Sequence, residues 1–142
     1  MASFTIQLAG LQATGPVVKL TLSVDQVLEK RLRAANQPVP APVLAHAMID
    51  TGASGTVINP AIPQQLNLNP VGGTFINTPS HANVRCYQYP VRVVFPNNVI
   101  AETIAIAAPL QGQAIQCLIG RDLLRHAVFV YIGYANLFTL SF

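Results

Sequence analysis

Hydrophobic and polar residues alternate along several short stretches of this chain, which is the pattern of half-buried β-strands. The two clearest stretches near the N-terminus are residues 4–8 and 17–24. Further strands are predicted at residues 43–49, 57–58, 84–95, 99–107, 115–119, 129–133 and 137–142. The sequence therefore predicts an all-β fold.

A long hairpin is predicted between residues 74 and 95. Gly72-Gly73 opens it, residues 74–77 form its first strand, and residues 84–95 form the return strand. Its small polar tip consists of Thr78, Pro79, Ser80, His81, Ala82 and Asn83.

Three short helical segments are predicted among the strands. Residues 25–36 have a helix-like composition, and the prolines that follow force an extended backbone up to residue 42. Residues 60–66 predict a helical turn. Asp122 is predicted to cap a short helix through residues 123–125.

The chain has 142 residues, a common size for one folded unit, and we expect residues 1–142 to form a single domain. Residues 1–42 would supply its N-terminal strands and an extended segment. Hydrophobic residues make up 51% of the chain and charged residues 9%, and the mean hydropathy is +0.44. Because this balance is apolar for a soluble monomer, we expect a partner to cover part of the surface.

The net charge of +3 arises from eight lysines and arginines against five acidic residues. The one dense basic cluster, at residues 30–33, lacks the long basic stripe with interleaved aromatic residues that is typical of nucleic-acid-binding proteins. No apolar run approaches the length of a membrane span, and the N-terminus lacks a signal pattern. We therefore expect a cytoplasmic or otherwise soluble protein that binds neither nucleic acid nor membranes.

Two separated segments carry the candidate chemistry. Asp50-Thr51-Gly52-Ala53-Ser54 places a carboxylate on a tight turn directly after a hydrophobic strand. Farther on, the apolar residues 117–119 lead into Gly120-Arg121-Asp122. Asp50 alone could be a turn residue whose carboxylate accepts backbone hydrogen bonds, but the pair of segments favours a catalytic role.

Together these two segments resemble those of the retropepsin-like aspartic peptidases, over roughly residues 15–142. In that family the Asp-Thr-Gly loop supplies the catalytic aspartate, and a segment with glycine followed by Arg-Asp or Arg-Asn packs beneath it. The resemblance implies an all-β, acid-protease closed barrel with a flap hairpin and one short C-terminal helix. It also implies an aspartic endopeptidase, a hydrolase that needs no metal or other cofactor.

The resemblance further implies a homodimer. Peptide hydrolysis by this route uses two aspartates about 3 Å apart that share one proton. This chain has one Asp-Thr-Gly, and it is too short for the two-lobed, pepsin-like arrangement that holds two. The second Asp50 would come from another copy across a twofold axis, and the substrate would be a protein or peptide.

The family's supporting roles map onto the same segments. Thr51 would cross-link the two loops at the dimer axis, Gly52 would let the backbone approach substrate, and Ala53 and Ser54 would line the cleft. The flap tip, residues 78–83, would close over the peptide. Gly120, Arg121 and Asp122 would be structural residues beneath the site, through a local ion pair or a helix cap.

Two features differ from the retroviral members of the family. The position of Ser54 is commonly an aspartate there, which pairs with the arginine that matches Arg121. Serine cannot form that ion pair, so Arg121 needs another partner. The flap tip of this chain also lacks the glycine-rich sequence of retroviral flaps.

Other interpretations stay open at this stage. The protein could be a noncatalytic dimerisation or peptide-binding module, or a protease active only after processing or only at acid pH. Cys86 and Cys117 could form one disulfide, although we expect free thiols. The three histidines, at positions 46, 81 and 126, are too scattered to predict a metal site.

Overall fold

Ten β-strands make up most of the computed structural model, which describes residues 2–77, 82–110 and 112–142. Their bounds are β1 (Ser3–Gln7), β2 (Val17–Ser23), β3 (Val43–Ile49), β4 (Val57–Ile58), β5 (Gly72–Ile76), β6 (Val84–Phe95), β7 (Val99–Ala107), β8 (Cys117–Ile119), β9 (Val128–Ile132) and β10 (Leu137–Ser141). Each predicted strand is present, with ends that shift by two residues or fewer. The alternating pattern therefore located the strands correctly.

Six of these strands form a closed barrel. Their order is β2-β3-β8-β4-β7-β6, and the pairing of β2 with β6, which places Leu22 opposite Val93, closes the ring. Most neighbours are antiparallel, but β3 runs parallel to β8 and β4 runs parallel to β7. The predicted all-β closed barrel is confirmed.

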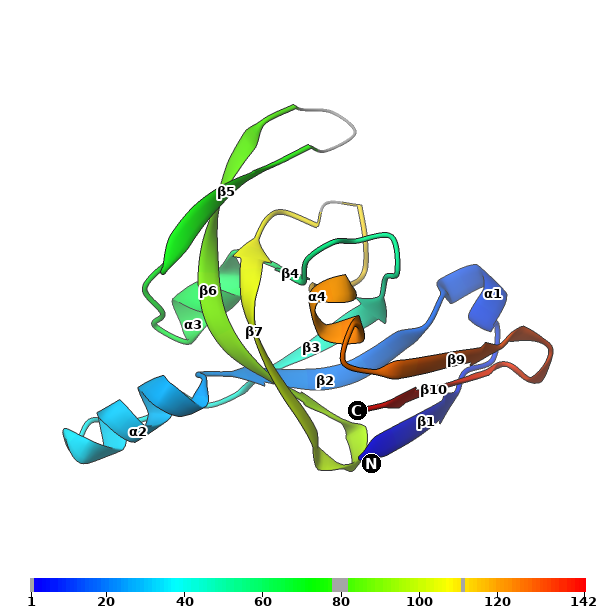
Figure 1. Cartoon of the computed structure of the whole chain (residues 1–142), viewed down its shortest axis with the longest axis horizontal. Coiled ribbons are helices and arrows are strands. Elements are labelled where there is room, and N and C mark those ends of the chain that lie inside the picture. Colours follow the sequence, from blue (N-terminus) through cyan, green and yellow to red (C-terminus); the bar gives the residue numbers. More distant parts are fainter. Residues whose placement is uncertain (1, 78–81, 111) are drawn as a thin grey trace.

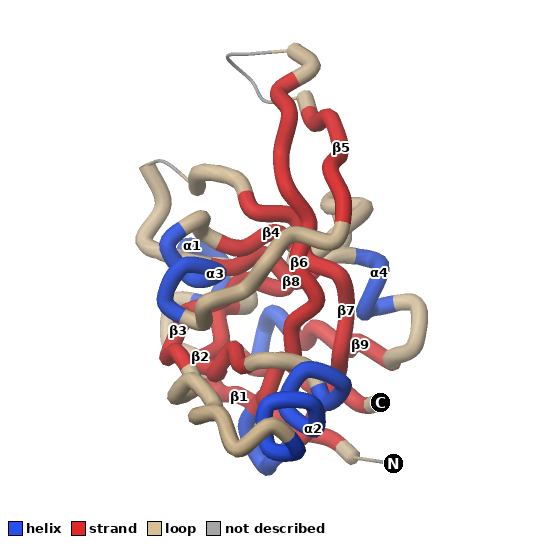
Figure 2. The backbone as a smooth tube through the Cα atoms, turned by 90° about the vertical axis from the view of Figure 1, so that its left-hand side faces the viewer, coloured by secondary structure: helices blue, strands red, loops and turns tan. Residues whose placement is uncertain are grey.

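The hairpin of β5 and β6 extends beyond the barrel. The second half of β6 pairs with β7 inside the ring, whereas its first half pairs with β5, from Gln88 opposite Gly72 to Val84 opposite Ile76. Figures 1 and 2 show this hairpin projecting from one end of the barrel. The loop that joins β3 to β4 lies at the same end (Figure 1).

A second, three-stranded sheet has the order β1-β10-β9. Its inner face packs on the barrel through aromatic side chains. The ring of Phe95 of β6 stacks on Phe4 of β1 with centroids 5.3 Å apart and lies 5.8 Å from the ring of Phe142. Within this sheet the N-terminal strand β1 pairs with the C-terminal strand β10.

Side chains that alternate along the barrel strands fill the core. Val91, Val93 and Phe95 of β6 are buried, whereas Arg92 between them lies on the outer face. Burial of each such apolar side chain stabilises the fold by about 1.5–3 kcal/mol. Residues 91–95 therefore alternate between the core and the outer face of the barrel.

Four α-helices and two 3-10 turns connect the strands of the described chain. They are α1 (Leu11–Thr14), α2 (Gln26–Ala34), α3 (Ala61–Gln65), α4 (Arg121–Leu124), η1 (Pro96–Asn98) and η2 (Gly133–Ala135). The helices predicted near residues 25–36, 60–66 and 123–125 are present, and α1 was not predicted. No helix in the described residues has the length and apolar character needed to cross a membrane.

The helix α2 projects away from the barrel (Figure 1) and buries none of its side chains. Its N-terminus is capped by Asp25, whose Oδ1 accepts a 3.0 Å hydrogen bond from the amide of Leu28. Polar contacts with the barrel hold it in place. Arg92 of β6 binds Glu29 at 2.7 Å and Glu102 at 3.2 Å.

Candidate active site

Asp50 lies on a turn at the end of β3 that its own hydrogen bonds shape. Its amide donates to the carbonyl of Ile119 at 2.9 Å, and its carbonyl accepts from the amide of Ala53 at 3.2 Å. The carboxylate Oδ1 accepts a 2.9 Å hydrogen bond from the amide of Gly52. The side chain is half-buried, so the loop orients a carboxylate that solvent still reaches.

The two segments singled out in the sequence lie side by side. Parallel pairing of β3 with β8 places Ile49 opposite Ile119, so the chain continues on one side into Asp50 and on the other into Gly120. A Cβ on Gly120 would lie 2.4 Å from the backbone carbonyl of Gly55. Only glycine fits there, because real Cβ atoms do not approach backbone so closely.

Arg121 joins its helix to the loop of Asp50. Its guanidinium Nη1 donates to the carbonyl of Thr51 at 2.8 Å, and its amide donates to the carbonyl of Ala53 at 2.9 Å. Arg121 therefore binds backbone carbonyls in place of the carboxylate that Ser54 lacks. Two hydrogen bonds from one residue fix the carbonyls on either side of Gly52.

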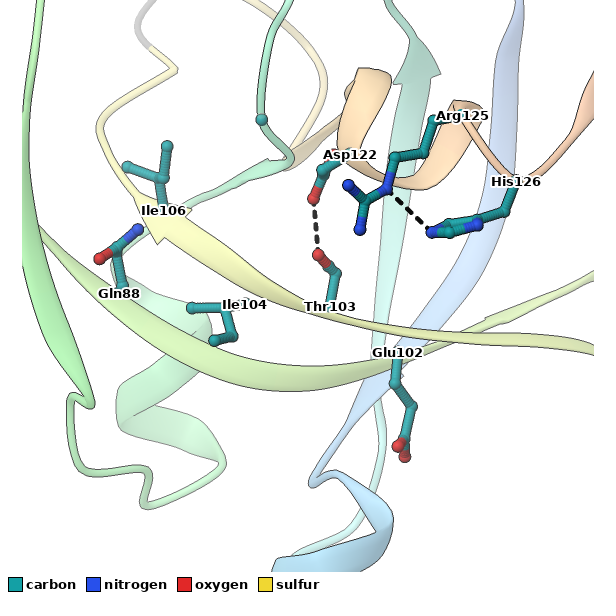
Figure 3. Close-up of a pocket in the computed structure, with 9 residues that line it drawn as sticks. Gln88, Glu102, Thr103, Ile104, Ile106, Asp122, Arg125 and His126 are labelled. Carbon is teal, nitrogen blue, oxygen red and sulfur yellow. Dashed lines mark hydrogen bonds between the residues drawn. The ribbon is translucent and has the colours of Figure 1, made fainter.

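Asp122 does not cap the helix, so that prediction was wrong. The N-cap of α4 is Gly120, and Asp122 lies in the first turn without a side-chain capping bond. Its carboxylate instead accepts hydrogen bonds from Thr56 at 2.8 Å and from Thr103 of β7 at 2.6 Å (Figure 3). The described residues contain no ion pair between Arg121 and Asp122.

Thr56 and Thr103 are site residues that the sequence did not reveal. The Thr56 side chain is fully buried, and its Oγ1 also accepts from the amide of Gly120 at 3.2 Å. Thr103 looks like any outward-facing polar residue in the alternating strand 99–107. The sequence signal for Thr56 is its position six residues after Asp50. Using that signal requires knowing that the loop folds back toward Gly120.

A family model described as aspartyl protease matches residues 37–123, which is more than half of the chain and contains both segments. The chain belongs to the aspartyl protease family. No curated protein matches the sequence.

Two solved structures are similar to this chain. A retropepsin-like aspartic protease from Rickettsia conorii aligns with a TM-score of 0.51 at 15% identity, over 99% of this chain and 94% of that one. The retroviral protease-like domain of Ddi1 from Leishmania major aligns with a TM-score of 0.44 at 14% identity, over 87% and 86%. The first likeness shows that the fold is retropepsin-like.

The other predicted site residues of the aspartyl protease domain are placed as follows. Thr51, Gly52 and Ser54 are exposed and Ala53 is half-buried, all on the loop of Asp50. Of the predicted flap tip, Ala82 and Asn83 are exposed at the start of the return strand. Thr78, Pro79, Ser80 and His81 lie outside the described residues.

The base of the hairpin borders a pocket of about 430 Å³ (Figure 3). Its lining residues are Gly55, Gln88, Glu102, Thr103, Ile104, Ile106, Asp122, Arg125 and His126. A second, larger and more apolar pocket of about 600 Å³ is lined in part by Val17 of β2 and by His46 and Met48 of β3. Asp50 lines neither of these two pockets.

The two cysteines lie in the interior of the domain. Cys86 and Cys117 are free and buried, and burial, together with the charge of Asp122, raises the pKa of Cys117 to about 12. The described residues hold no group of three or more His, Cys, Asp or Glu side chains suited to a metal ion.

Proposed function

We propose that this aspartyl protease domain is a homodimeric aspartic endopeptidase in which the two copies of Asp50 activate one water molecule. The observation that supports this most directly is the fixed, solvent-accessible carboxylate of Asp50. The backbone of Gly52 holds one of its oxygens, and Arg121 and Gly120 hold the loop from behind. A turn aspartate without a catalytic role needs no such support from a distant segment.

The surroundings of the other acidic residues argue that the second carboxylate comes from another copy. Asp25 caps α2, and Asp122 binds two threonine hydroxyls. Glu29 and Glu102 both bind Arg92. Each of the four has structural partners, so Asp50 has no acidic companion within the subunit.

The chemistry follows from two like carboxylates held close together. They cannot both ionise, so the pair carries one proton. The ionised Asp50 removes a proton from a water molecule whose oxygen attacks the carbonyl carbon, while the protonated Asp50 donates to the carbonyl oxygen. Collapse of the tetrahedral intermediate breaks the C–N bond as the leaving nitrogen receives a proton.

The neighbouring residues take supporting roles in this proposal. Thr51 of each subunit would bind across the axis, and Gly52 would leave room for the peptide backbone. Ala53 and Ser54 would line the cleft. The β5–β6 hairpin, which stands at the same end of the barrel as the loop joining β3 to β4, would cover an extended peptide and pair with it as an added strand.

Digestion of a mixed peptide library between pH 3 and 7 tests the proposal, with wild type, Asp50→Asn and the matched control Asp25→Asn. Asp50→Asn should lower kcat/KM by about 10²–10⁴-fold, because the pair loses its acid–base function. Asp25→Asn should retain activity. Titrating Asp50→Asn protein into a fixed amount of wild type should also lower activity, because mixed dimers form.

Two outcomes would overturn this function. Cleavage that survives Asp50→Asn would exclude Asp50 from the mechanism. Absence of cleavage by wild type at every pH, with retained binding of extended peptides, would instead establish a noncatalytic peptide-binding module.

A further inference from the structure

Two contrasting rows of side chains lie on the outer face of the barrel, just before the loop of Asp50. Antiparallel pairing of β2 with β3 places Val17 opposite Met48 and Lys19 opposite His46. The four side chains share the outer face, because the residues that alternate with them are buried in the core. We call Val17 and Met48 the apolar row, and Lys19 and His46 the basic row. About 7 Å separates the two rows, which is twice the rise per strand residue.

A pocket of about 600 Å³ lies over the apolar row, and His46 of the basic row also lines it. Further apolar walls come from Leu8, Ala114 and Ile115. Gln116, the next residue along the chain, fixes this wall against β3. Its amide donates to the carbonyl of His46 at 2.9 Å, and its Oε1 accepts from the amide of His46 at 2.9 Å. A mostly apolar pocket of this size can accept a large apolar side chain.

The basic row has no acidic partner among the described residues. Lys19 and His46 are both exposed, and neither takes part in an ion pair in that part of the chain. Cβ atoms of directly opposite strand residues lie about 4.5–5.5 Å apart, and like charges at that separation destabilise a sheet once the histidine is protonated. One carboxylate placed between the two side chains can bind both of them. An acidic ligand would therefore offset the repulsion within the row.

We infer that this face binds an extended peptide that carries a large apolar residue and, two residues away, an aspartate or glutamate. In an extended peptide, side chains two residues apart point to the same side and lie about 7 Å apart, which matches the separation of the two rows. The apolar side chain enters the pocket over Met48, and the carboxylate lies between Lys19 and His46. This inference rests on the proposed function, because the peptide is a segment of the substrate.

Both rows lie within reach of a peptide bound at Asp50. Met48 precedes Asp50 by two residues and His46 precedes it by four, so the basic row lies about 13 Å from Asp50 along β3. An extended peptide spans that distance with about four residues. The end of β3 is held to the segment before β2, because the amide of Ile49 donates to the carbonyl of Pro16 at 3.1 Å. One substrate is therefore long enough to contact Asp50 and both rows, which would select its sequence on one side of the cleaved bond.

Peptide binding to Asp50→Asn protein, which should not cleave, tests the site at about pH 6. The probes are peptides of alanine and serine that carry leucine and glutamate two residues apart, in each of the two orders, and the same peptides with glutamine in place of glutamate. In NMR titrations at low salt, one glutamate peptide should bind about 5-fold tighter than its glutamine counterpart, because its carboxylate meets two cations. The amide signals of residues 17–19 and 46–48 should shift. The preference should shrink in about 0.5 M NaCl.

Substitutions in the two rows give a second test, with folding checked by circular dichroism. Lys19→Glu should bind the glutamate peptide more weakly and should prefer the same peptide with lysine at that position. His46→Gln should reduce the preference for glutamate over glutamine. Met48→Ala should weaken the binding of both peptides alike, because it removes apolar contact. Lys30→Glu is the matched control, since it makes the same charge change at an exposed lysine of α2, and it should bind as the parent protein does.

Three results would overturn the site: equal binding of the glutamate and glutamine peptides, signal shifts confined to other parts of the protein, or a Lys19→Glu protein that still prefers glutamate. The site and the catalytic proposal can fail separately. If the preference follows Lys19 but wild type cleaves no peptide, the site stands and the function is wrong. If wild type cleaves, Asp50→Asn does not, and neither protein prefers acidic peptides, the function stands and the site is wrong.

Discussion

The hydroxyl of Thr56 donates a 2.8 Å hydrogen bond to the carboxylate of Asp122, which lies 66 residues farther along the chain. The same carboxylate accepts from Thr103 at 2.6 Å, and the Thr56 oxygen accepts from the amide of Gly120 at 3.2 Å. One acidic side chain thus joins the loop after Asp50, strand β7 and helix α4; Figure 3 shows its bond to Thr103 of β7.

Replacement of Asp122 should therefore destabilise the whole fold. We expect Asp122→Ala to lower the free energy of unfolding by about 2–4 kcal/mol, because two hydrogen bonds to a charged acceptor are lost and the buried Thr56 hydroxyl loses its partner. Asp122→Asn keeps one acceptor oxygen and should lose less. Urea denaturation measures both, and equal losses for the two variants would contradict this account.

The contact of Gly120 with Gly55 predicts a second loss of stability. In Gly120→Ala the new methyl group would meet backbone at 2.4 Å, so the two segments must separate. We expect a loss of about 3 kcal/mol or more in urea denaturation. Gly73→Ala is a matched control, since its nearest neighbour would lie at an ordinary 3.6 Å. A Gly120→Ala protein as stable as this control would disprove the close packing.

Local patterns in the sequence were sufficient for most of the fold. Strand 17–23 buries Val18, Leu20 and Leu22 and leaves the residues between them more exposed, so its periodicity is visible without knowledge of its neighbours. The four-residue helix α1 escaped prediction because it is too short to show a period. It follows Gly10, whose φ of 75° few other residues adopt, and it buries only Leu11.

The site was predictable only in part, because some of its contacts join residues that are distant in the sequence. Asp50 and Gly120 stand out because hydrophobic strands precede them. The role of Asp122 did not stand out, since an acidic residue at the start of a short helix fits a helix cap equally well. Its actual partners depend on the tertiary fold, which brings β7 against α4. No short segment of the sequence predicts that contact.

Arg121 gives a prediction for catalysis, given the proposed function. We expect Arg121→Ala to lower kcat by about 10²-fold, because loss of the bond to the Thr51 carbonyl lets the loop of Asp50 shift. Its side chain is exposed, so the free energy of unfolding should change by less than about 1 kcal/mol. Arg31→Ala, on the exposed face of α2, is the control. Unchanged kcat in Arg121→Ala would show that the loop needs no such support.

The buried thiol of Cys117 predicts how stability falls in alkali. Burial, and then the charge of Asp122, raises the pKa of Cys117 from 9.0 to about 12. Above pH 9 the unfolded chain releases this proton while the folded protein keeps it, so stability is lost as the pH rises from 9 toward 12. Between pH 8 and 10.5 wild type should lose about 2 kcal/mol more than Cys117→Ala. Parallel losses in the two proteins would refute this.

Glu29 predicts the opposite dependence, at acid pH and confined to α2. Hydrogen bonds from Arg92 and then Arg33 lower its pKa below 4.5, so its contribution is present above pH 4.5 and lost as the pH falls through the lowered pKa. Since α2 buries no side chain, Glu29→Gln should speed amide hydrogen exchange in α2 at pH 6, and the difference should shrink below pH 4.5. Arg33→Gln should have the smaller effect, because Arg33 is 67% exposed whereas Arg92 also binds Glu102. Equal exchange in wild type and Glu29→Gln at pH 6 would mean that other contacts hold α2.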